Sequence, residues 1–235
     1  MSKETLLKNK IFYFFYKYLK IFRNKKGKLF FSEMGEHIII NRLFRKINLG
    51  FYIDVGAYHP FKGSLTYLLF KRGWKGVNLD LSKTSIDLFK ICRPRDLNIN
   101  CAVLNKDGKT FFYQNSIINQ QNSIFKNDKK QKKIRIKSLK LDSIIKRNCI
   151  KRVDFLNVDT EGAELDVVMS LNLKIFRPKL ISVEDNNSFS AQDVLKTKLH
   201  NYLNKKRYIL FNRVGATNIY LSREYKKQAV NNFNL

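Results

Sequence analysis

The feature that most constrains the fold is the stretch 51–60, which reads Phe-Tyr-Ile-Asp-Val-Gly-Ala-Tyr-His-Pro. It begins as an apolar run typical of a buried strand, and it ends with Asp54, Gly56 and a turn before Pro60. Open α/β folds build a ligand crevice in this way, because a buried strand brings a carboxylate and a glycine-containing loop to the carboxyl edge of the sheet. The stretch therefore predicts a cofactor site at the end of a central strand.

Three later strand-like runs also end in an acid. These runs are residues 76–80, 153–159 and 179–184, and their last residues are Asp80, Asp159 and Glu184. Amphipathic stretches with helical spacing lie between them, and a closing antiparallel hairpin is expected over 208–221. Alternation of strands and helices favours right-handed crossovers and a mostly parallel sheet with helices on both faces. The acids are then expected at one edge of the sheet.

The spacing of the acids also bears on the class of cofactor. Asp80 follows Asp54 by 26 positions, close to the offset at which a second-strand acid binds ribose hydroxyls. The sequence after Gly56 lacks the GxGxxG fingerprint for a pyrophosphate, and the chain has no GK[ST] phosphate loop. A cofactor with ribose and adenine but no pyrophosphate fits these residues better, which favours S-adenosylmethionine (SAM).

Together these motifs resemble those of the FkbM-type SAM-dependent methyltransferases, which have the seven-stranded class I methyltransferase fold. The resemblance implies a single sheet of order 3-2-1-4-5-7-6 with the last strand antiparallel. It covers about residues 32 to 222 and rests on the joint occurrence, order and spacing of six segments. These are 32–36 (SEMGE), 52–60 (YIDVGAYHP), 73–80 (GWKGVNLD), 93–96 (RPRD), 154–164 (DFLNVDTEGAE) and 177–184 (RPKLISVE).

The resemblance places SAM on the first loop and the acceptor beside the fourth strand. The candidate cofactor contacts are Asp54, Gly56, Ala57, Ser64, Asp80, Leu81, Ala102 and Asp159. Methyl transfer to oxygen needs a base that receives the hydroxyl proton. Asp159 is the favoured base, with Glu161 assisting it and His59 as the alternative.

Each catalytic candidate has a structural alternative. His59 can simply shape the turn before Pro60, and an acid such as Glu161 or Glu164 is also favoured at a helix N-terminus by the helix dipole. A divalent cation is possible if Asp159 binds it together with Glu184 or Asp185. No metal ligand is assigned.

Three classes of function are compatible with the sequence. The first is SAM-dependent methyl transfer to a hydroxyl oxygen of a small molecule or a sugar, including a glycan. The second is methylation of nucleic acid at a ribose 2′-oxygen; base methylation is disfavoured because the loop 159–162 lacks proline and aromatic residues. The third is a non-catalytic basic binding module. Nucleic acid is the less favoured partner.

A formal charge of +27 predicts attraction to polyanions, or else lysines spread over solvated faces. Residues 1–31 are expected to form a basic amphipathic helical extension, either lying on an anionic membrane or packed on the main domain. The methyltransferase domain is expected over 32–224 and a basic tail over 225–235. Three scattered cysteines and no long apolar run predict a cytoplasmic protein, with peripheral contact at the inner membrane face as a further possibility.

Overall fold

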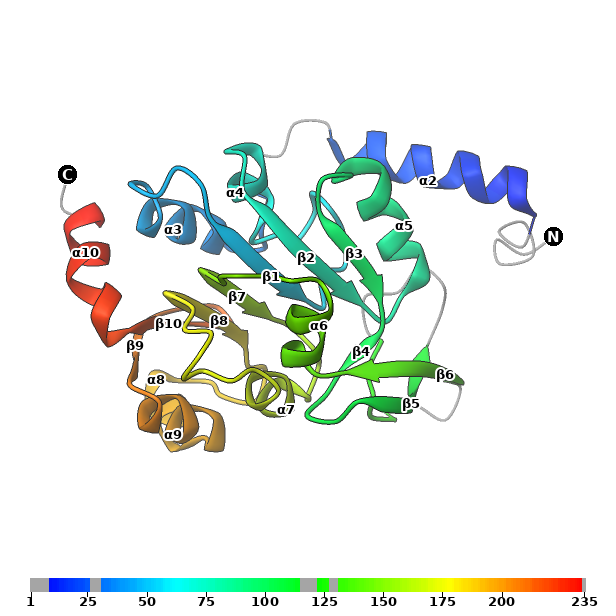
Figure 1. The fold of residues 1–235 in the computed structure, drawn as a ribbon. Coiled ribbons are helices and arrows are strands. Elements are labelled where there is room, and N and C mark those ends of the chain that lie inside the picture. Colours follow the sequence, from blue (N-terminus) through cyan, green and yellow to red (C-terminus); the bar gives the residue numbers. More distant parts are fainter. Residues whose placement is uncertain (1–8, 26–30, 115–121, 127–130, 234–235) are drawn as a thin grey trace.

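The computed structural model of the chain describes residues 9–25, 31–114, 122–126 and 131–233. At its centre is a seven-stranded sheet of order β3-β2-β1-β7-β8-β10-β9 (Figure 1). Its strands are β1 (Phe51–Val55), β2 (Lys75–Asp80), β3 (Leu97–Asn100), β7 (Phe155–Val158), β8 (Leu180–Glu184), β9 (Tyr208–Val214) and β10 (Thr217–Ser222). Counted along the chain within this sheet, the order is 3-2-1-4-5-7-6, as the sequence predicts.

Strand β1 occupies the middle of the sheet and pairs in parallel with β2 and β7. In this register Asp54 lies level with Asn78 on one side and Asn157 on the other. Strand β8 continues the parallel arrangement, and β10 runs antiparallel to both β8 and β9. The predicted antiparallel last strand is therefore confirmed, and the carboxyl ends of β1, β2, β7 and β8 meet at one edge.

Helices cover both faces of the sheet (Figure 1). Successive strand residues point to opposite faces, so Tyr52 and Ile53 enter different cores. One core packs beneath α3 (Glu36–Leu43), α4 (Tyr67–Lys71) and α10 (Arg223–Phe233). The other packs beneath α6 (Leu141–Arg147), α7 (Glu164–Met169), α8 (Ala191–Lys196) and α9 (Lys198–Lys205).

A smaller three-stranded sheet follows the third strand, and the sequence did not predict it as a separate sheet. It contains β4 (Ala102–Val103), β5 (Gly108–Gln114) and β6 (Lys132–Leu139), in the order β4-β6-β5. The alternation of apolar and polar residues over 97–103 is typical of a single strand. It breaks after β3, and Ala102 then pairs with Ser138 of β6. This turn carries the chain over the carboxyl edge of the main sheet.

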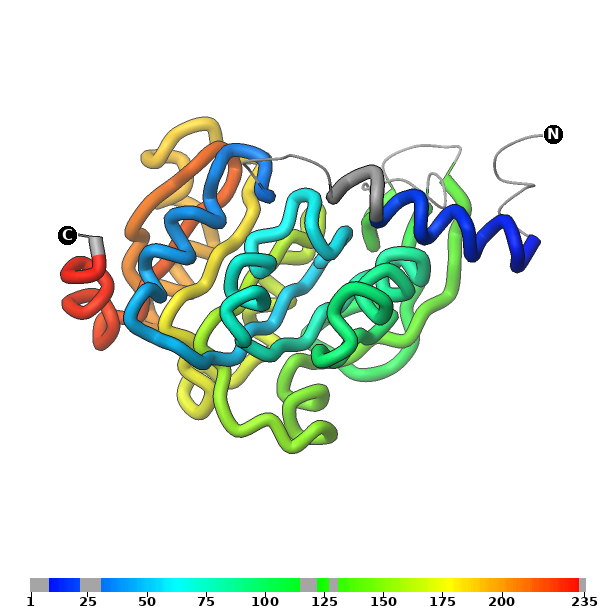
Figure 2. Tube along the Cα trace, turned by 90° about the horizontal axis from the view of Figure 1, so that it is seen from above, coloured from blue at the N-terminus to red at the C-terminus, as the bar shows by residue number. Residues whose placement is uncertain are grey.

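The two ends of the described chain are helical. At one end, α2 (Lys10–Lys25) lies along α5 (Lys83–Cys92), away from the central sheet (Figure 2). At the other, residues that were expected to be a basic tail form α10, because Tyr225 and Ala229 are buried against α3. The Tyr225 hydroxyl donates a 2.6 Å hydrogen bond to the carbonyl of Leu43. Among the described residues, no helix combines the length and apolar character needed to cross a membrane.

Candidate functional site

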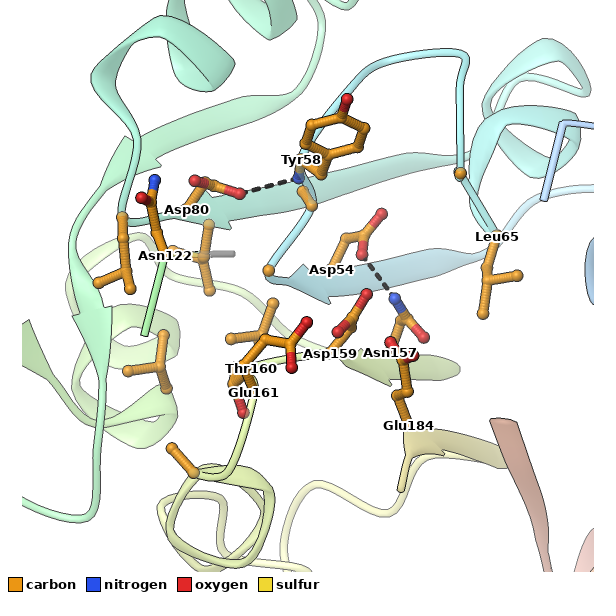
Figure 3. A pocket seen from close by; sticks show the side chains of 18 of the residues that line it. Asp54, Tyr58, Leu65, Asp80, Asn122, Asn157, Asp159, Thr160, Glu161 and Glu184 are labelled. Carbon is orange, nitrogen blue, oxygen red and sulfur yellow. Dashed lines mark hydrogen bonds between the residues drawn. The ribbon is translucent and has the colours of Figure 1, made fainter. Parts of the chain in front are cut away.

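A cavity of about 410 Å³ lies at the carboxyl ends of β1, β2, β7 and β8 (Figure 3). The loop after β1, the start of the small sheet and the loop after β7 form its walls. A parallel sheet gathers its strand ends at one edge, and ligands of such folds bind there. This cavity is therefore the candidate site.

The loop after β1 approaches the backbone just after β7 very closely at a glycine. Gly56 has φ of 76°, and a Cβ placed on it would lie 1.6 Å from the backbone oxygen of Asp159. The amides of Gly56 and Ala57 both donate to the carbonyl of Leu79 in β2. Only glycine fits between the two strands here, so the residue fixes the shape of the loop that borders the cavity.

Asp54 is almost fully buried and is held from both sides. Its Oδ1 accepts a 2.8 Å hydrogen bond from the Asn157 amide, and its Oδ2 accepts a 2.7 Å bond from the Thr66 hydroxyl. Burial raises the pKa of Asp54, while these two hydrogen bonds and the charge of Arg93 oppose that rise. The carboxyl group thus ties β1 to β7 and to the helix that follows the loop.

Arg93 organises the same loop from beneath. Its guanidinium is buried and donates to the hydroxyls of Thr66 and Ser64, each at 2.8 Å, and to the carbonyl of Pro60 at 2.5 Å. Since Thr66 in turn donates to Asp54, one network joins the arginine, the loop and the strand acid. Ser64, a predicted cofactor contact, belongs to this network and not to the cavity lining.

Asp80 ends β2 at the cavity wall. Its Oδ2 accepts a 2.8 Å hydrogen bond from the amide of Tyr58 (Figure 3). Its Oδ1 accepts a 2.6 Å bond from the amide of Ser82. Burial raises the pKa of Asp80 to about 6, although these two bonds favour the charged form. Each carboxylate oxygen retains a lone pair, so the group can also accept hydrogen bonds from a ribose.

Asp159 and Glu184 form a coupled carboxyl pair at the ends of β7 and β8. Burial, a hydrogen bond to Glu184 and the nearby negative charges raise the pKa of Asp159 well above its ordinary value. Asp159 therefore keeps its proton to a higher pH than an exposed aspartic acid does. In its ionised form it can accept a proton from a ligand.

Glu161 lies at the rim of the same cavity. Partial loss of hydration and the charges of Glu184, Glu164 and Glu33 raise its pKa. Its backbone has φ of 54°, and Tyr58, on the opposite loop, has φ of 52°. Such positive values cost non-glycine residues roughly 1–3 kcal/mol and concentrate at functional sites. Both residues line the cavity.

The structure brings most of the predicted site residues together, but it does not bring His59. The predicted residues that line the cavity are Asp54, Gly56, Ala57, Asp80, Leu81, Ala102, Asp159 and Glu161. The His59 side chain is 1% exposed and lies outside this lining. Its Nδ1 accepts hydrogen bonds from the amides of Phe61 and Lys62, and the ring also bonds to the backbone of Lys20 in α2.

The electrostatics of His59 agree with that placement. Burial and the charges of Lys20, Lys62 and Arg93 lower its pKa to about 3. A neutral ring with both nitrogens engaged by the backbone is a poor proton acceptor. The geometry favours a positioning role, in which His59 links the loop after β1 to helix α2.

Asn122 is a cavity residue that sequence reasoning missed. Its side chain is 9% exposed, and its Oδ1 is buried without a hydrogen-bond partner in the part of the chain that the structure describes. In the view of Figure 3 it lies on the same side of the cavity as Asp80. A buried acceptor without a partner is costly, so this oxygen is a candidate for contact with a ligand. The surrounding segment has no periodicity that would have singled it out.

The cavity differs in charge from the rest of the chain. Its described lining includes no Lys, Arg or His, although the chain contains 46 Lys and Arg residues. The lining acids are Glu33, Glu36, Asp54, Asp80, Asp159, Glu161 and Glu184. Such a site attracts cationic or neutral ligands and repels phosphates.

The described residues contain no group of three or more His, Cys, Asp or Glu side chains arranged to hold a metal ion. Asp185, which was considered as a partner of Asp159 in a cation site, instead accepts hydrogen bonds from the Ser188 hydroxyl and the Asn187 amide.

Comparison with known proteins gives a family match. A solved TehB-like SAM-dependent methyltransferase from Corynebacterium glutamicum is 12% identical with a TM-score of 0.48, and covers 88% of this chain and 97% of its own. The METTL16 MTase domain is 13% identical with a TM-score of 0.44, over 80% of this chain and 65% of its own. No curated protein matches this chain. A model of the methyltransferase FkbM domain, however, matches residues 54–210, more than half of the chain. The chain therefore belongs to the FkbM methyltransferase family, whose members use SAM as the methyl donor.

Proposed function

We propose that the protein transfers a methyl group from SAM to a hydroxyl oxygen of a small molecule or a sugar, including a sugar of a glycan. The observation that carries this proposal is Asp159, which lies beside Glu184 in a cavity lined by carboxylates and, among the described residues, by no cation. A hydroxyl must lose its proton as it is methylated, and ionised Asp159 can receive that proton.

The residues of the cavity fit SAM. Asp80 has lone pairs for the ribose hydroxyls, and the glycine-containing loop at Gly56 borders the same space. Apolar side chains of Leu81 and Ala102 can contact adenine, and the Oδ1 of Asn122 can accept a hydrogen bond from its amino group. Bound SAM supplies an electrophilic methyl group. Its positive charges suit a cavity that contains several carboxylates.

Asp159 has to be ionised to act as the base. Loss of activity is expected at low pH, where Asp159 binds a proton, because burial, the hydrogen bond to Glu184 and the nearby negative charges raise its pKa. Glu161 contributes negative charge at the rim and is the second candidate proton acceptor. His59 acts through the loop that it anchors.

Ribose methylation of nucleic acid is disfavoured by the same cavity. Ribose 2′-O methylation uses a set of two lysines, an aspartate and a glutamate, yet no lysine is found among the described lining residues. Seven carboxylic acids around the site would also repel a phosphate backbone. A purely structural binding module gives no reason for so many acids around one cavity, since neighbouring like charges cost free energy to hold together.

A first experiment separates these functions. Calorimetry with SAM and S-adenosylhomocysteine should show binding, and labelled SAM should transfer its methyl group to an acceptor in a panel of sugars and hydroxylated small molecules. Asp159→Asn should retain SAM binding and lower turnover by about 10²-fold or more, the usual scale of a general base. Transfer to RNA but to no member of the panel would establish the ribose alternative instead. Failure to bind SAM would overturn both enzymatic functions.

A second experiment tests the cofactor contacts. The wild-type protein should bind S-adenosylhomocysteine more tightly than S-inosylhomocysteine, which lacks the amino group, by about 5- to 10-fold, the scale of one hydrogen bond. Asn122→Ala should remove this preference, whereas Asn148→Ala, outside the cavity lining, should keep it. Equal preference in all three proteins would exclude Asn122 from adenine recognition.

A further inference from the structure

Helix α2 presents an unusual surface. Five large apolar side chains of this helix are at least half exposed, namely Ile11 at 67%, Phe12 at 52%, Phe14 at 50%, Phe15 at 60% and Leu19 at 68%. Ile11, Phe14, Phe15 and Leu19 follow the spacing i, i+3, i+4 and i+8 of a single helical stripe, and Phe12 lies beside it, three residues before Phe15 and seven before Leu19. A packed amphipathic helix normally turns such a stripe toward the core, whereas α2 turns it outward.

The opposite side of α2 holds the helix on the domain. The Tyr13 hydroxyl donates a 3.0 Å hydrogen bond to the carboxylate of Asp87 in α5. Ile21 is 6% exposed and packs with Phe61 and Leu88. The apolar stripe is thus exposed while the helix is docked by other residues, so docking does not explain the stripe.

Charge identifies the surface that fits this stripe. The sequence of α2 contains five lysines and arginines and no acid, within a chain of charge +27. Lysines beside an apolar stripe can extend their ammonium groups to lipid phosphates while the apolar side chains enter the acyl boundary. A second copy of this chain would bring two strongly positive helices together, and nucleic acid offers no apolar surface of this kind.

We propose that α2 binds in the plane of an anionic lipid bilayer through Ile11, Phe12, Phe14, Phe15 and Leu19. The attachment is peripheral, since no described helix can cross a membrane. Lys20 of α2 contacts His59 through its backbone, and Tyr58, the neighbour of His59, lines the cavity. The membrane helix and the candidate site therefore share one loop.

The test is co-sedimentation of the full chain with vesicles. Phosphatidylcholine vesicles with 30% phosphatidylserine, a chosen composition of roughly the anionic content of a cytoplasmic leaflet, should pellet the protein, and pure phosphatidylcholine vesicles should pellet it far less. Added salt should weaken the binding, because the electrostatic part is screened. The triple variant Phe12→Ser, Phe15→Ser and Leu19→Ser should lower the partition coefficient by about 10-fold or more.

A matched control removes three apolar side chains elsewhere that are at least as exposed. The variant Leu49→Ser, Ile175→Ser and Phe189→Ser replaces residues that are 68%, 71% and 94% exposed, and it should bind vesicles like the wild type. Circular dichroism and thermal melting should show that both variants fold. Equal loss in the two variants, or no binding by the wild type, would overturn the proposal. So would a wild-type dimer that the α2 variant converts to a monomer without any vesicle binding.

Discussion

The carboxyl group of Asp80 should make the stability of the ligand-free protein depend on pH in a defined direction. Burial raises its pKa from the ordinary value of 3.8 to about 6 in the folded protein. Between these two values the folded state keeps a proton that the unfolded state has released. Stability therefore falls as pH rises through this window, because the folded state binds more protons.

The size of the effect follows from the shift. A difference of about two pKa units corresponds to about 3 kcal/mol, at 1.36 kcal/mol per unit. Asp80 faces the cavity, where water partly solvates it, so we expect a measured change of about 1–3 kcal/mol. Asp80→Asn cannot titrate. The unfolding free energy of the variant minus that of the wild type should increase by this amount between pH 4 and pH 7.

The informative quantity is how the difference in unfolding free energy changes with pH, not its value at any one pH. In the variant, an amide NH₂ faces either the Tyr58 or the Ser82 backbone N–H, and the lost bond costs about 1–3 kcal/mol at every pH. Urea unfolding of both proteins at several pH values without SAM measures the difference directly. Asp166→Asn, at an exposed position, serves as the control. A difference curve for Asp80→Asn that is as flat as that of the control would refute the buried titration of Asp80.

Three further changes test how the site is held. Gly56→Ala should destabilise the protein by about 3 kcal/mol or more in urea unfolding. Gly63 also has positive φ but leaves room for a Cβ, so Gly63→Ala should cost only about 1–2 kcal/mol. Equal costs would contradict the close approach of Gly56 to the backbone of Asp159. Arg93→Met should lower the free energy of unfolding by about 3–5 kcal/mol, since the Thr66 and Ser64 hydroxyls and the Pro60 carbonyl lose their charged partner. A change below about 1 kcal/mol would show that Arg93 does not hold this loop. Tyr225→Phe should cost about 1 kcal/mol, because its carbonyl partner keeps a second donor; a neutral result would contradict the docking of α10.

The sheet and its acid-bearing edge could be predicted because both follow from local patterns. A buried run that ends in Asp54 or Asp80 specifies a strand and its direction, and parallel pairing then puts both acids at one edge. The order of the strands needed the family resemblance, since periodicity alone does not say which strands are neighbours.

The parts that could not be predicted depend on contacts between distant segments. The turn containing Arg93 looks like a surface turn in sequence, yet its guanidinium is buried beneath the loop after β1. His59 stands within the strongest motif, and only the position of α2 shows that its ring supports a helix. Asn122 lies in a polar stretch without periodicity, so its burial in the cavity has no sequence signal.

The separation of charge within the molecule connects the site with the proposed membrane contact. Seven of the chain's 19 acids line one cavity, while α2 contributes only positive charge. An anionic surface would therefore attract the outside of the protein and be repelled by the site itself. A polyanion such as RNA can meet the exterior without entering the cavity, so retention on nucleic acid would not by itself indicate the substrate. Methyl transfer, and not binding, is therefore the measurement that identifies the acceptor. This distribution of charge favours a neutral or cationic hydroxyl compound, offered at a bilayer surface, as the acceptor class.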